Sequence, residues 1–231
     1  DWTDGACSPE AMASALGGAL DGVLAEEVVL KADGVVPVPA HLSTLEAATL
    51  PCAALTAWNA LVEVGRLKAG DTVLLLGTGG VSIFALQFAT AMGARVILTS
   101  SSDAKLERAR AMGAAETVNY KANPDWQQAV LDLTGGRGVD VTVEVGGPGT
   151  LARSVEATRV AGRVALIGVL TGGTIDPTLI MRKSITLQGV YVGSRRMFRE
   201  MNKALALHSI KPVIDHTVPF AYARAAYHAM E

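Results

Sequence analysis

The sequence predicts an α/β protein built on a doubly wound parallel sheet of six strands. Two observations lead to this prediction. From Asp71 onward, short and almost wholly apolar segments alternate with helical segments, which is typical of parallel strands joined by crossover helices and covered on both faces. In addition, a glycine-rich turn, Gly77-Thr78-Gly79-Gly80, follows the first of these strands and opens a helix, as in sheets that bind ligands at the carboxyl ends of their strands.

The predicted elements follow one another in a regular order. Strands are expected over residues 73–76, 95–99, 116–119, 139–145, 163–169 and 185–192. Helices are expected over residues 55–64, 80–92, 103–112, 125–133, 150–158 and 196–208. Asp103 is interpreted as a helix cap, because a side-chain oxygen at that position can accept from the first free N–H groups. Six strands in this alternation favour a doubly wound sheet over other α/β architectures.

The opening segment has a different character. Residues 1–22 are small and polar and are expected to form a loop with a short helix. Residues 23–30 and 35–39 are expected to be short strands, the second at a sheet edge because of its prolines. Ser43 and Glu46 form a capping-box pattern, which predicts the start of a helix.

The composition limits the possible functions. Half of the 231 residues are apolar, so a sizeable core is available and global disorder is excluded. The 20 basic and 22 acidic residues give a net charge of −2. The chain thus has no excess of positive charge to attract a phosphate backbone, and nucleic acid is not expected as a partner. No segment offers the run of about 18 apolar residues that a membrane span needs. Two cysteines cannot form a disulfide framework, and we expect a cytoplasmic protein without membrane contact.

The glycine-rich turn predicts a dinucleotide site. Gly77-Thr78-Gly79-Gly80-Val81-Ser82 matches the pattern G-x-G-x-x-G, with Ser82 in the third glycine position. The first glycine permits a tight turn, the second lets the backbone approach a pyrophosphate, and the third position needs only a small residue. The helix that follows offers free N–H groups to the phosphates. The alternative is a glycine turn that has a structural role only and binds no ligand.

The end of the second strand indicates which dinucleotide is bound. An acidic residue about 20 positions after the turn usually accepts the ribose hydroxyls of NAD, but Ser100-Ser101-Ser102 occupies that place. Without a carboxylate, a 2′-phosphate meets no like-charge repulsion and can accept hydrogen bonds from hydroxyl groups. Lys105 and Tyr120 are candidates to complete the site, although Lys105 can also be an ordinary solvated lysine. We therefore favour NADPH over NADH.

Several long motifs resemble the medium-chain dehydrogenase/reductase superfamily, in its zinc-type alcohol dehydrogenase-like and quinone oxidoreductase-like branch. The resemblance extends over nearly the whole chain and is carried by residues 50–89, 99–114, 135–147, 162–169 and 187–195. It implies a Rossmann cofactor domain that interrupts a β-rich, GroES-like catalytic domain. It also implies that about a hundred upstream residues of such a subunit, and its last strands, lie outside this sequence.

The resemblance implies three segments and a set of cofactor-binding residues. Residues 1–53 correspond to the end of the GroES-like domain, residues 54–208 to the dinucleotide-binding domain, and residues 209–231 to a return to the catalytic domain. The implied cofactor-binding residues share a position at or near the carboxyl ends of the strands. They are Thr56 near the nicotinamide; Gly77, Gly79, Gly80 and Val81 at the pyrophosphate; Ser100, Ser101, Lys105 and Tyr120 at the 2′-phosphate; and Gly146, Gly168, Val169, Val192 and Gly193 after strands four to six.

The resemblance also bears on whether the protein binds zinc. The resemblance places Cys52 where zinc-dependent members have their third protein ligand, but a catalytic zinc needs three protein ligands and one open position. His41, His208, His216 and His228 show no metal-ligand spacing. We therefore expect no zinc, and Cys52 remains an alternative ligand.

The sequence thus predicts an NADPH-dependent oxidoreductase that passes a hydride to a small carbonyl, enone or quinone. Two alternatives stay open: a zinc-dependent alcohol dehydrogenase that uses Cys52, and an NADPH-binding structural or redox-sensing protein without turnover. No catalytic residue can be assigned, although Tyr191 and Arg195 are candidates for substrate or phosphate contact. The expected partners are a small-molecule substrate and a second copy of the chain, paired through the sixth strand.

Overall fold

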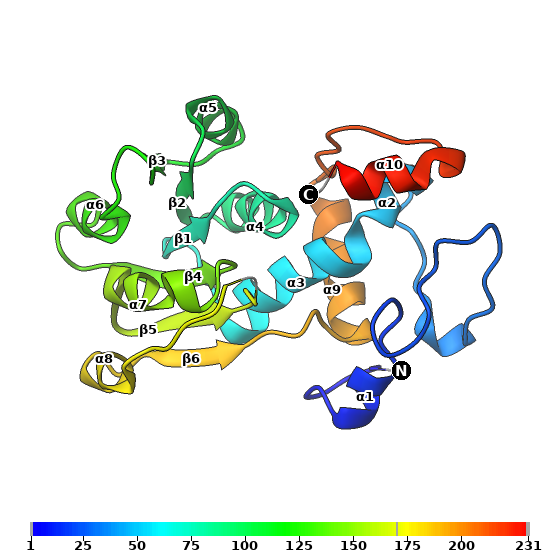
Figure 1. Cartoon of the computed structure of the whole chain (residues 1–231), viewed down its shortest axis with the longest axis horizontal. Helices are drawn as coiled ribbons and strands as arrows, with labels where there is room; N and C mark the ends of the chain where they lie inside the picture. Colours follow the sequence, from blue (N-terminus) through cyan, green and yellow to red (C-terminus); the bar gives the residue numbers. More distant parts are fainter. Residues whose placement is uncertain (1, 170, 230–231) are drawn as a thin grey trace.

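The computed structural model describes residues 2–169 and 171–229. Six parallel strands form one sheet in the order β3-β2-β1-β4-β5-β6 (Figure 1). The strands are β1 (Thr72–Leu76), β2 (Arg95–Ser100), β3 (Glu116–Asn119), β4 (Val139–Glu144), β5 (Thr158–Leu166) and β6 (Thr186–Gly189). The order runs outward from β1 on one side and from β4 on the other, so the topological switch point lies between them. The predicted doubly wound parallel sheet is confirmed.

Helices connect the strands and complete the flanks. They are α1 (Pro9–Ala13), α2 (Thr44–Ala48), α3 (Leu55–Trp58), α4 (Gly80–Ala91), α5 (Asp103–Ala111), α6 (Trp126–Leu133), α7 (Pro148–Ala157), α8 (Pro177–Arg182), α9 (Arg195–Leu207) and α10 (Ala223–His228). Two wider π-helical segments, η2 (Leu50–Ala54) and η3 (Asn59–Val64), flank α3, and short 3₁₀ turns lie at η1 (Ala32–Gly34) and η4 (Phe220–Tyr222). The helix predicted over residues 55–64 is therefore present, with its second half widened.

The helices cover both faces of the sheet. The side chains of Val73 and Leu75 pack with α3, α4, α5 and α9 on one face, whereas Leu74 and Leu76 pack with α6 on the other. Towards β5 and β6, the second face is covered by α7 and α8. All five side chains of β1 are buried, which explains why the strand has no polar alternation in its sequence.

The two strands predicted before α2 are wrong. Residues 23–30 and 35–39 form no strand, and their apolar side chains are largely exposed, with Val29 wholly so. Extended backbone is stable as a strand only where a neighbour pairs its N–H and C=O groups, and no described strand lies beside these residues. The capping box at Ser43 and Glu46 is confirmed, since each side chain accepts from the other residue's backbone N–H group.

Other predicted boundaries need smaller corrections. Ser102, and not Asp103, caps α5, because its hydroxyl accepts from the Lys105 N–H group. The apolar runs predicted as strands five and six end earlier than expected, at Leu166 and Gly189, and their last residues form loops. The helix α8 was not predicted, although Asp176 caps it and a proline stands at its first position. In the closing segment, the last described helix, α10, ends at His228.

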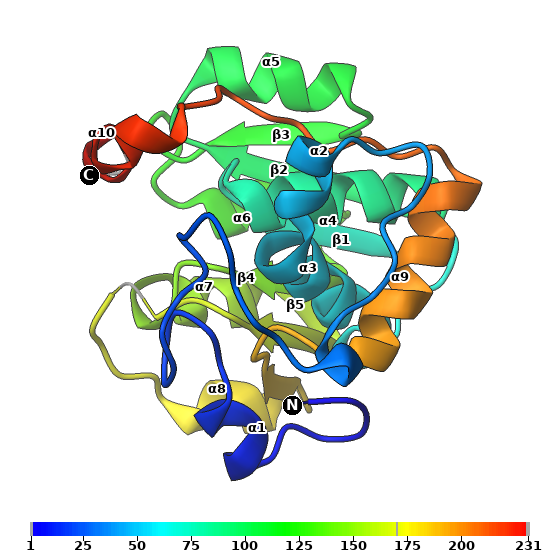
Figure 2. The same cartoon turned by 90° about the vertical axis from the view of Figure 1, so that its right-hand side faces the viewer.

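Both flanking segments are tied to the sheet domain. The backbone N–H groups of Arg195 and Arg196, at the start of α9, donate to the carbonyls of Trp2 and Thr3, both at 3.0 Å. The segment after α9 runs past α2 and back across the molecule to α10 (Figure 2). At the start of this segment, the ring of His41 lies 3.0 Å from the carbonyl oxygen of Ile210. The opening and closing segments are therefore in contact with each other.

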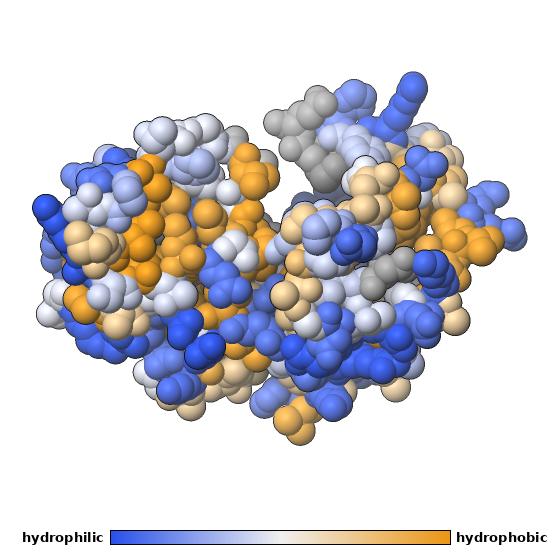
Figure 3. All heavy atoms as spheres, turned by 90° about the horizontal axis from the view of Figure 1, so that it is seen from below, coloured by the Kyte–Doolittle hydropathy of each residue, from blue (hydrophilic) through white to orange (hydrophobic). Residues whose placement is uncertain are grey.

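The flanking segments also carry exposed apolar residues. In Figure 3 apolar side chains gather at the right-hand end of the surface, where Figure 1 shows the segment before α2. The exposed residues there share an aliphatic character; they include Leu16, Leu20, Val23, Leu24, Val28, Val29, Leu30, Val35 and Val38. No described helix has both the length and the apolar character needed to cross a bilayer.

A buried carboxylate stabilises the amino-terminal end of the sheet. Asp140, at the start of β4, is 6% exposed and accepts from Arg137 at 2.6 Å, from the Thr72 N–H group at 2.9 Å and from Arg159 at 2.6 Å. Burial by itself raises the pKa of this carboxyl, but these hydrogen bonds outweigh it and lower the pKa from 3.8 to about 2. The ionised side chain therefore joins β1, β4 and β5 far from the carboxyl edge.

We predict that Asp140→Asn lowers the free energy of unfolding at pH 7 by about 2 kcal/mol, since one pKa unit corresponds to about 1.4 kcal/mol. The folded-state pKa is below the unfolded one, so this stability is present above about pH 4 and is lost as the pH falls towards the folded pKa of about 2. Urea unfolding across this pH range measures the difference from the wild type. The matched control is Asp21→Asn, because the Asp21 side chain is exposed; an equal loss in both variants would contradict the prediction.

Candidate cofactor site

The turn between β1 and α4 lies at the centre of the carboxyl edge of the sheet. Gly77 has a φ of +71°, which favours glycine, and Gly79 precedes the helix with extended backbone. A Cβ atom built at Gly77 or Gly79 would meet no atom of the described residues within 4 Å. The first i→i−4 bond of α4 runs from Ile83 to the Gly79 carbonyl at 3.0 Å, so the N–H groups before Ile83 point out of the helix end. The space and the donors fit a pyrophosphate.

Ser82 fills the third glycine position by turning its polar group inward. Its side chain is 1% exposed, and its hydroxyl donates to the carbonyl of Leu76, the last residue of β1, at 2.6 Å. This bond fixes the first turn of α4 against the strand, which is the close packing that a glycine allows in other dinucleotide-binding turns. The substitution of serine for glycine therefore preserves the geometry of the turn.

The segment from η2 to α3 joins the phosphate turn to the far side of the carboxyl edge. A Cβ atom at Gly80 would lie 3.2 Å from the Cβ of Ala53, and a Cβ atom at Gly193 would lie 2.8 Å from the Cγ of Leu55. Thr56 follows directly on α3 and is 3% exposed. Thr56 thus follows a residue that packs against the loop after β6, and its place beside the cofactor stays a prediction.

Hydroxyl groups line the end of β2. The hydroxyl of Ser100 lies 3.5 Å from that of Thr78 in the phosphate turn and accepts from the Ser102 N–H group at 3.4 Å. The Tyr120 N–H group donates to the Ser100 carbonyl at 3.0 Å, so Tyr120 lies beside this serine. Ser101 is half-buried, and Lys105 is exposed on the first turn of α5. The four residues predicted to bind a 2′-phosphate therefore lie around one strand end.

The nearest carboxylate, Asp103, is already engaged. Its Oδ1 atom accepts from the side-chain amide of Asn119 at 2.7 Å, a contact that joins α5 to the end of β3. An NAD-type ribose contact would need a free carboxylate at the end of β2, where the chain has serines. The end of β2 thus carries serine hydroxyl groups where an NAD-type site has a carboxylate.

A fully buried glutamate organises the loop after β4. Glu144 is 0% exposed, and its Oε1 atom accepts from the Gly146 N–H group at 2.7 Å, the Gly147 N–H group at 3.0 Å and the Thr150 hydroxyl at 2.7 Å. The Ser154 hydroxyl donates to its other oxygen. A carboxylate satisfied in this way keeps the loop closed over the strand end. This glutamate was not predicted as a site residue, although an acid among the valines at the end of β4 was the available signal.

The loops after β4 and β5 approach each other closely. A Cβ atom at Gly168 would lie 2.3 Å from the Gly147 nitrogen, and Gly147 has a φ of +85°. The N–H groups of Ile167 and Gly168 donate to the Glu144 carbonyl at 2.8 and 2.9 Å. Val169, the next residue, is 86% exposed. Gly146, Gly168 and Val169 are therefore brought together, as predicted from their places after the strands.

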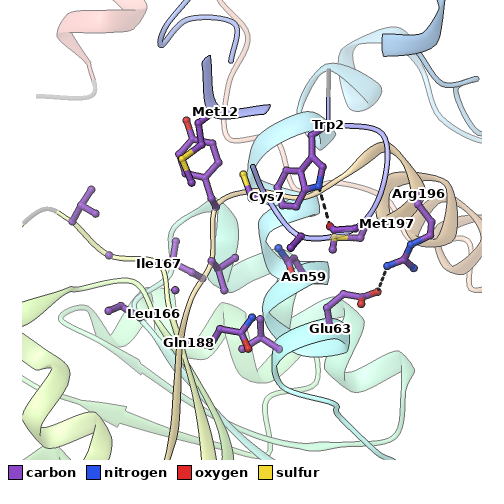
Figure 4. Close-up of a pocket in the computed structure, with 18 of the residues that line it drawn as sticks. Trp2, Cys7, Met12, Asn59, Glu63, Leu166, Ile167, Gln188, Arg196 and Met197 are labelled. Atoms are coloured by element: carbon purple, nitrogen blue, oxygen red, sulfur yellow. Dashed lines mark hydrogen bonds and ion pairs between the residues drawn. The ribbon is translucent and has the colours of Figure 1, made fainter. Parts of the chain in front are cut away.

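A hollow of about 800 Å³ borders the loops after β5 and β6 (Figure 4). Its lining comes from the opening segment, from η3, from the start of α9 and from the two strand ends. The lining residues include Trp2, Met12, Asn59, Glu63, Ile167, Val169, Val190, Tyr191 and Met197. Most of these side chains are apolar, and the ion pair between Glu63 and Arg196, at 3.3 Å, forms a polar end. Tyr191 is among the lining residues. Arg195 points elsewhere, 3.8 Å from Asp33.

The metal-ligand candidate stands apart from other ligands. The Cys52 thiol is exposed on η2. Within residues 2–169 and 171–229, no three His, Cys, Asp or Glu side chains gather in a group that could hold a metal ion. The zinc alternative thus has one candidate ligand in the described part of the chain.

The fold and this edge define a Rossmann-type dinucleotide-binding protein, and comparisons with known proteins give its family. Residues 80–207 match the family described as zinc-binding dehydrogenase. This chain belongs to that family, within the medium-chain dehydrogenase/reductase superfamily that its sequence resembles.

Similar proteins extend the match over nearly the whole chain. A zinc-type alcohol dehydrogenase-like protein of Schizosaccharomyces pombe is 43% identical over 235 residues, which cover 98% of this chain and 68% of that protein. The crystal structure of a putative alcohol dehydrogenase from Sinorhizobium meliloti is 43% identical with a TM-score of 0.92, and the match covers 99% of this chain and 68% of that one. The structure of an NAD-dependent alcohol dehydrogenase is 35% identical with a TM-score of 0.86, over 93% of this chain and 63% of that one. The chain therefore spans 63% to 68% of the length of these proteins.

We predict that Glu144→Gln lowers the free energy of unfolding by about 1–3 kcal/mol. Glutamine keeps one oxygen and turns the other into an NH2 group, so either the loop N–H groups or the buried Ser154 hydroxyl loses its charged acceptor. Thermal or urea unfolding measures the loss. The matched control is Glu156→Gln, since the Glu156 side chain is exposed on α7. Equal stability of Glu144→Gln and the wild type would show that the glutamate does not hold the loop.

Proposed function

We propose that this chain is the cofactor-binding part of an NADPH-dependent oxidoreductase, which passes a hydride to a small carbonyl, enone or quinone. The observation that carries the proposal is the carboxyl edge of the sheet. There an open glycine turn at the start of α4 lies beside a strand end lined by Ser100, Ser101 and Tyr120. The family supports the reaction class, and the absence of an acid after β2 supports the phosphorylated cofactor.

The residues of the chain would hold the cofactor in three parts. The N–H groups at the start of α4 would bind the pyrophosphate, where the helix dipole favours negative charge. Ser100, Ser101 and Tyr120 would donate hydroxyl hydrogen bonds to the 2′-phosphate, and Lys105 would add a positive charge. The loops around Gly146 and Gly168 would hold the nicotinamide end. When bound, this group supplies the hydride, and the protein orients the ring and excludes water.

The hollow beside the loops after β5 and β6 supports a substrate with an apolar body. Its walls include Trp2, Met12, Ile167 and Val190, and apolar lining with few polar groups is typical of small-molecule sites. The hollow shares Gly168 and Val169 with the proposed nicotinamide end, so a substrate lodged in it would lie beside the cofactor.

Direct titration with both cofactors tests the proposal. We expect NADPH to bind at least tenfold more tightly than NADH. The serine hydroxyls at the end of β2 can donate hydrogen bonds to a 2′-phosphate, whereas an acidic residue in their place would repel it. Quenching of tryptophan fluorescence or calorimetry gives the two dissociation constants. Tighter binding of NADH, as expected for the NAD-dependent alcohol dehydrogenase that the chain resembles, would contradict the proposed preference.

We predict that Gly79→Ala leaves the fold intact and weakens NADPH binding at least tenfold. The backbone at Gly79 is extended, and a Cβ atom there meets no described atom within 4 Å, so the stability should change by less than about 0.5 kcal/mol. The added methyl group would instead occupy the space of the pyrophosphate. Gly34→Ala is the control, because a Cβ atom at Gly34 also meets nothing within 4 Å among the described residues. Equal NADPH affinity in both variants would place the pyrophosphate elsewhere.

A zinc-dependent alcohol dehydrogenase is the second candidate. It is favoured by the position of Cys52, whose neighbour Ala53 packs against the first turn of α4. Metal analysis of the longest natural form of the protein decides between the two candidates. Stoichiometric zinc that is lost in Cys52→Ser would support the zinc enzyme. If NADPH binds but is not consumed with a panel of quinones, enones and aldehydes, the protein is a cofactor-binding protein without turnover.

We also propose that two copies of the chain pair through β6. This strand bonds to β5 on one side, and no other described strand covers its second edge. An open edge is a template for pairing with another strand, and pairing there would continue the sheet across a dimer. Light scattering during gel filtration should give twice the mass of the chain; a monomer at high concentration would contradict this.

A further inference from the structure

The turn after β6 contains an unusual backbone conformation. Val192 has a φ of +46°, in the left-handed region. Among the described non-glycine residues with positive φ, the others are Arg66, Ala161, Ser184 and Ser209, so Val192 alone is β-branched. A β-branched residue is a genuine outlier there, and such strain persists only where the surroundings hold it.

A side chain from a distant part of the sequence holds this residue in place. The Nδ2 atom of Asn59 donates to the Val192 carbonyl at 2.8 Å. Asn59 is 5% exposed and is the first residue of η3, the π-helical segment that directly follows α3. Its amide is a buried polar group in an otherwise apolar stretch, and Val192 supplies its acceptor. The hydrogen bond thus joins η3 to the turn after β6, 133 positions away.

The residues after Val192 are also fixed. Gly193 packs against Leu55, because a Cβ atom at Gly193 would lie 2.8 Å from the Leu55 Cγ atom. Ser194 is fully buried and caps α9, with its hydroxyl accepting from the Met197 N–H group at 3.3 Å. The α9 side of the turn is therefore packed and capped, and the Asn59 amide holds the Val192 carbonyl between β6 and α9.

The same turn lies beside the proposed nicotinamide end. Asn59, Gly168, Val169 and Tyr191 all line the hollow in Figure 4, so η3 and the loops after β5 and β6 meet in one wall. Backbone N–H and C=O groups of fixed loops are suited to a planar carboxamide, which has both donors and acceptors. Val192 follows Tyr191 of this wall, and strained backbone is often found at ligand sites.

We propose that Asn59 is a positioning residue for the nicotinamide end of the cofactor. Its side-chain amide holds Val192 in the left-handed conformation and so presets the backbone of Val192 and Gly193 for the carboxamide. Asn59 itself acts through Val192, at a distance from the hydride. The inference rests on the proposed function, because it assumes that the carboxyl edge binds a nicotinamide dinucleotide.

Two ligands separate this role from a purely structural one. The dissociation constants of NADPH and of 2′,5′-ADP, which lacks the nicotinamide half, are measured by calorimetry on the full chain. We expect Asn59→Leu to weaken NADPH binding about tenfold, as for the loss of one well-placed hydrogen bond, and to change 2′,5′-ADP binding less than twofold. Adding Val192→Gly to this variant should restore part of the NADPH affinity, because glycine adopts positive φ without strain.

Asn202→Leu is the matched control. Asn202 also donates from its side-chain amide to a distant carbonyl, that of Pro37 at 3.1 Å, but it does so from α9. This variant should leave the affinity for both ligands unchanged. If Asn59→Leu does not fold, Asn59→Ser is measured in its place, because serine is smaller and remains polar.

Each result has a definite meaning. Selective loss of NADPH affinity in the Asn59 variant, with partial recovery in the double variant, supports the proposal. Equal loss for NADPH and 2′,5′-ADP, or no loss for either, overturns it while the proposed cofactor site stands. If the wild-type chain binds neither ligand, the proposed function fails and this inference fails with it.

Discussion

Close approach of backbone segments is the constraint on which the carboxyl edge depends. Gly147 and Gly168 bring the loops after β4 and β5 into contact, Gly193 admits Leu55, and Gly80 admits Ala53, at distances that a Cβ atom would violate or strain. Gly79 is different, because its missing side chain leaves open space. Glycine therefore has two roles at this edge: it lets the protein close on itself, and it leaves one turn open to a ligand.

Buried polar groups complete what the glycines allow. Glu144 closes the loop after β4, and Asn59 fixes the turn after β6. At the opposite end of the sheet, Asp140 joins three strands and has no part in the proposed site. Glu144 and Asp140 accept several hydrogen bonds each, and Asn59 donates one, in line with the rule that buried polar side chains have hydrogen-bond partners. The carboxyl edge is thus fixed by contacts within the protein, and an apolar hollow lies beside it.

The central part of the fold could be predicted from the sequence, because apolar strands and alternating helices depend on local pattern. The turn at Gly77–Ser82 was predictable for the same reason, since its strand, glycines and helix are consecutive. The strands expected over residues 23–30 and 35–39 failed because a strand needs a neighbour, which local pattern does not reveal. Asn59 and Glu144 were missed because their roles depend on partners such as Val192, 133 positions away. The cap of α5 differed by one residue, as two adjacent polar side chains, Ser102 and Asp103, can each serve as a cap.

The central claim is that the carboxyl edge binds a nicotinamide dinucleotide, and hydrogen–deuterium exchange with and without NADPH tests it most directly. The account predicts slower exchange in three groups of residues: the turn at 77–83, the strand end at 100–105, and the loops at 145–150, 167–169 and 190–194. Exchange around Asp140 should not change, because this residue lies at the other end of the sheet. No protection at the turn, or protection confined to other surfaces, would contradict the account.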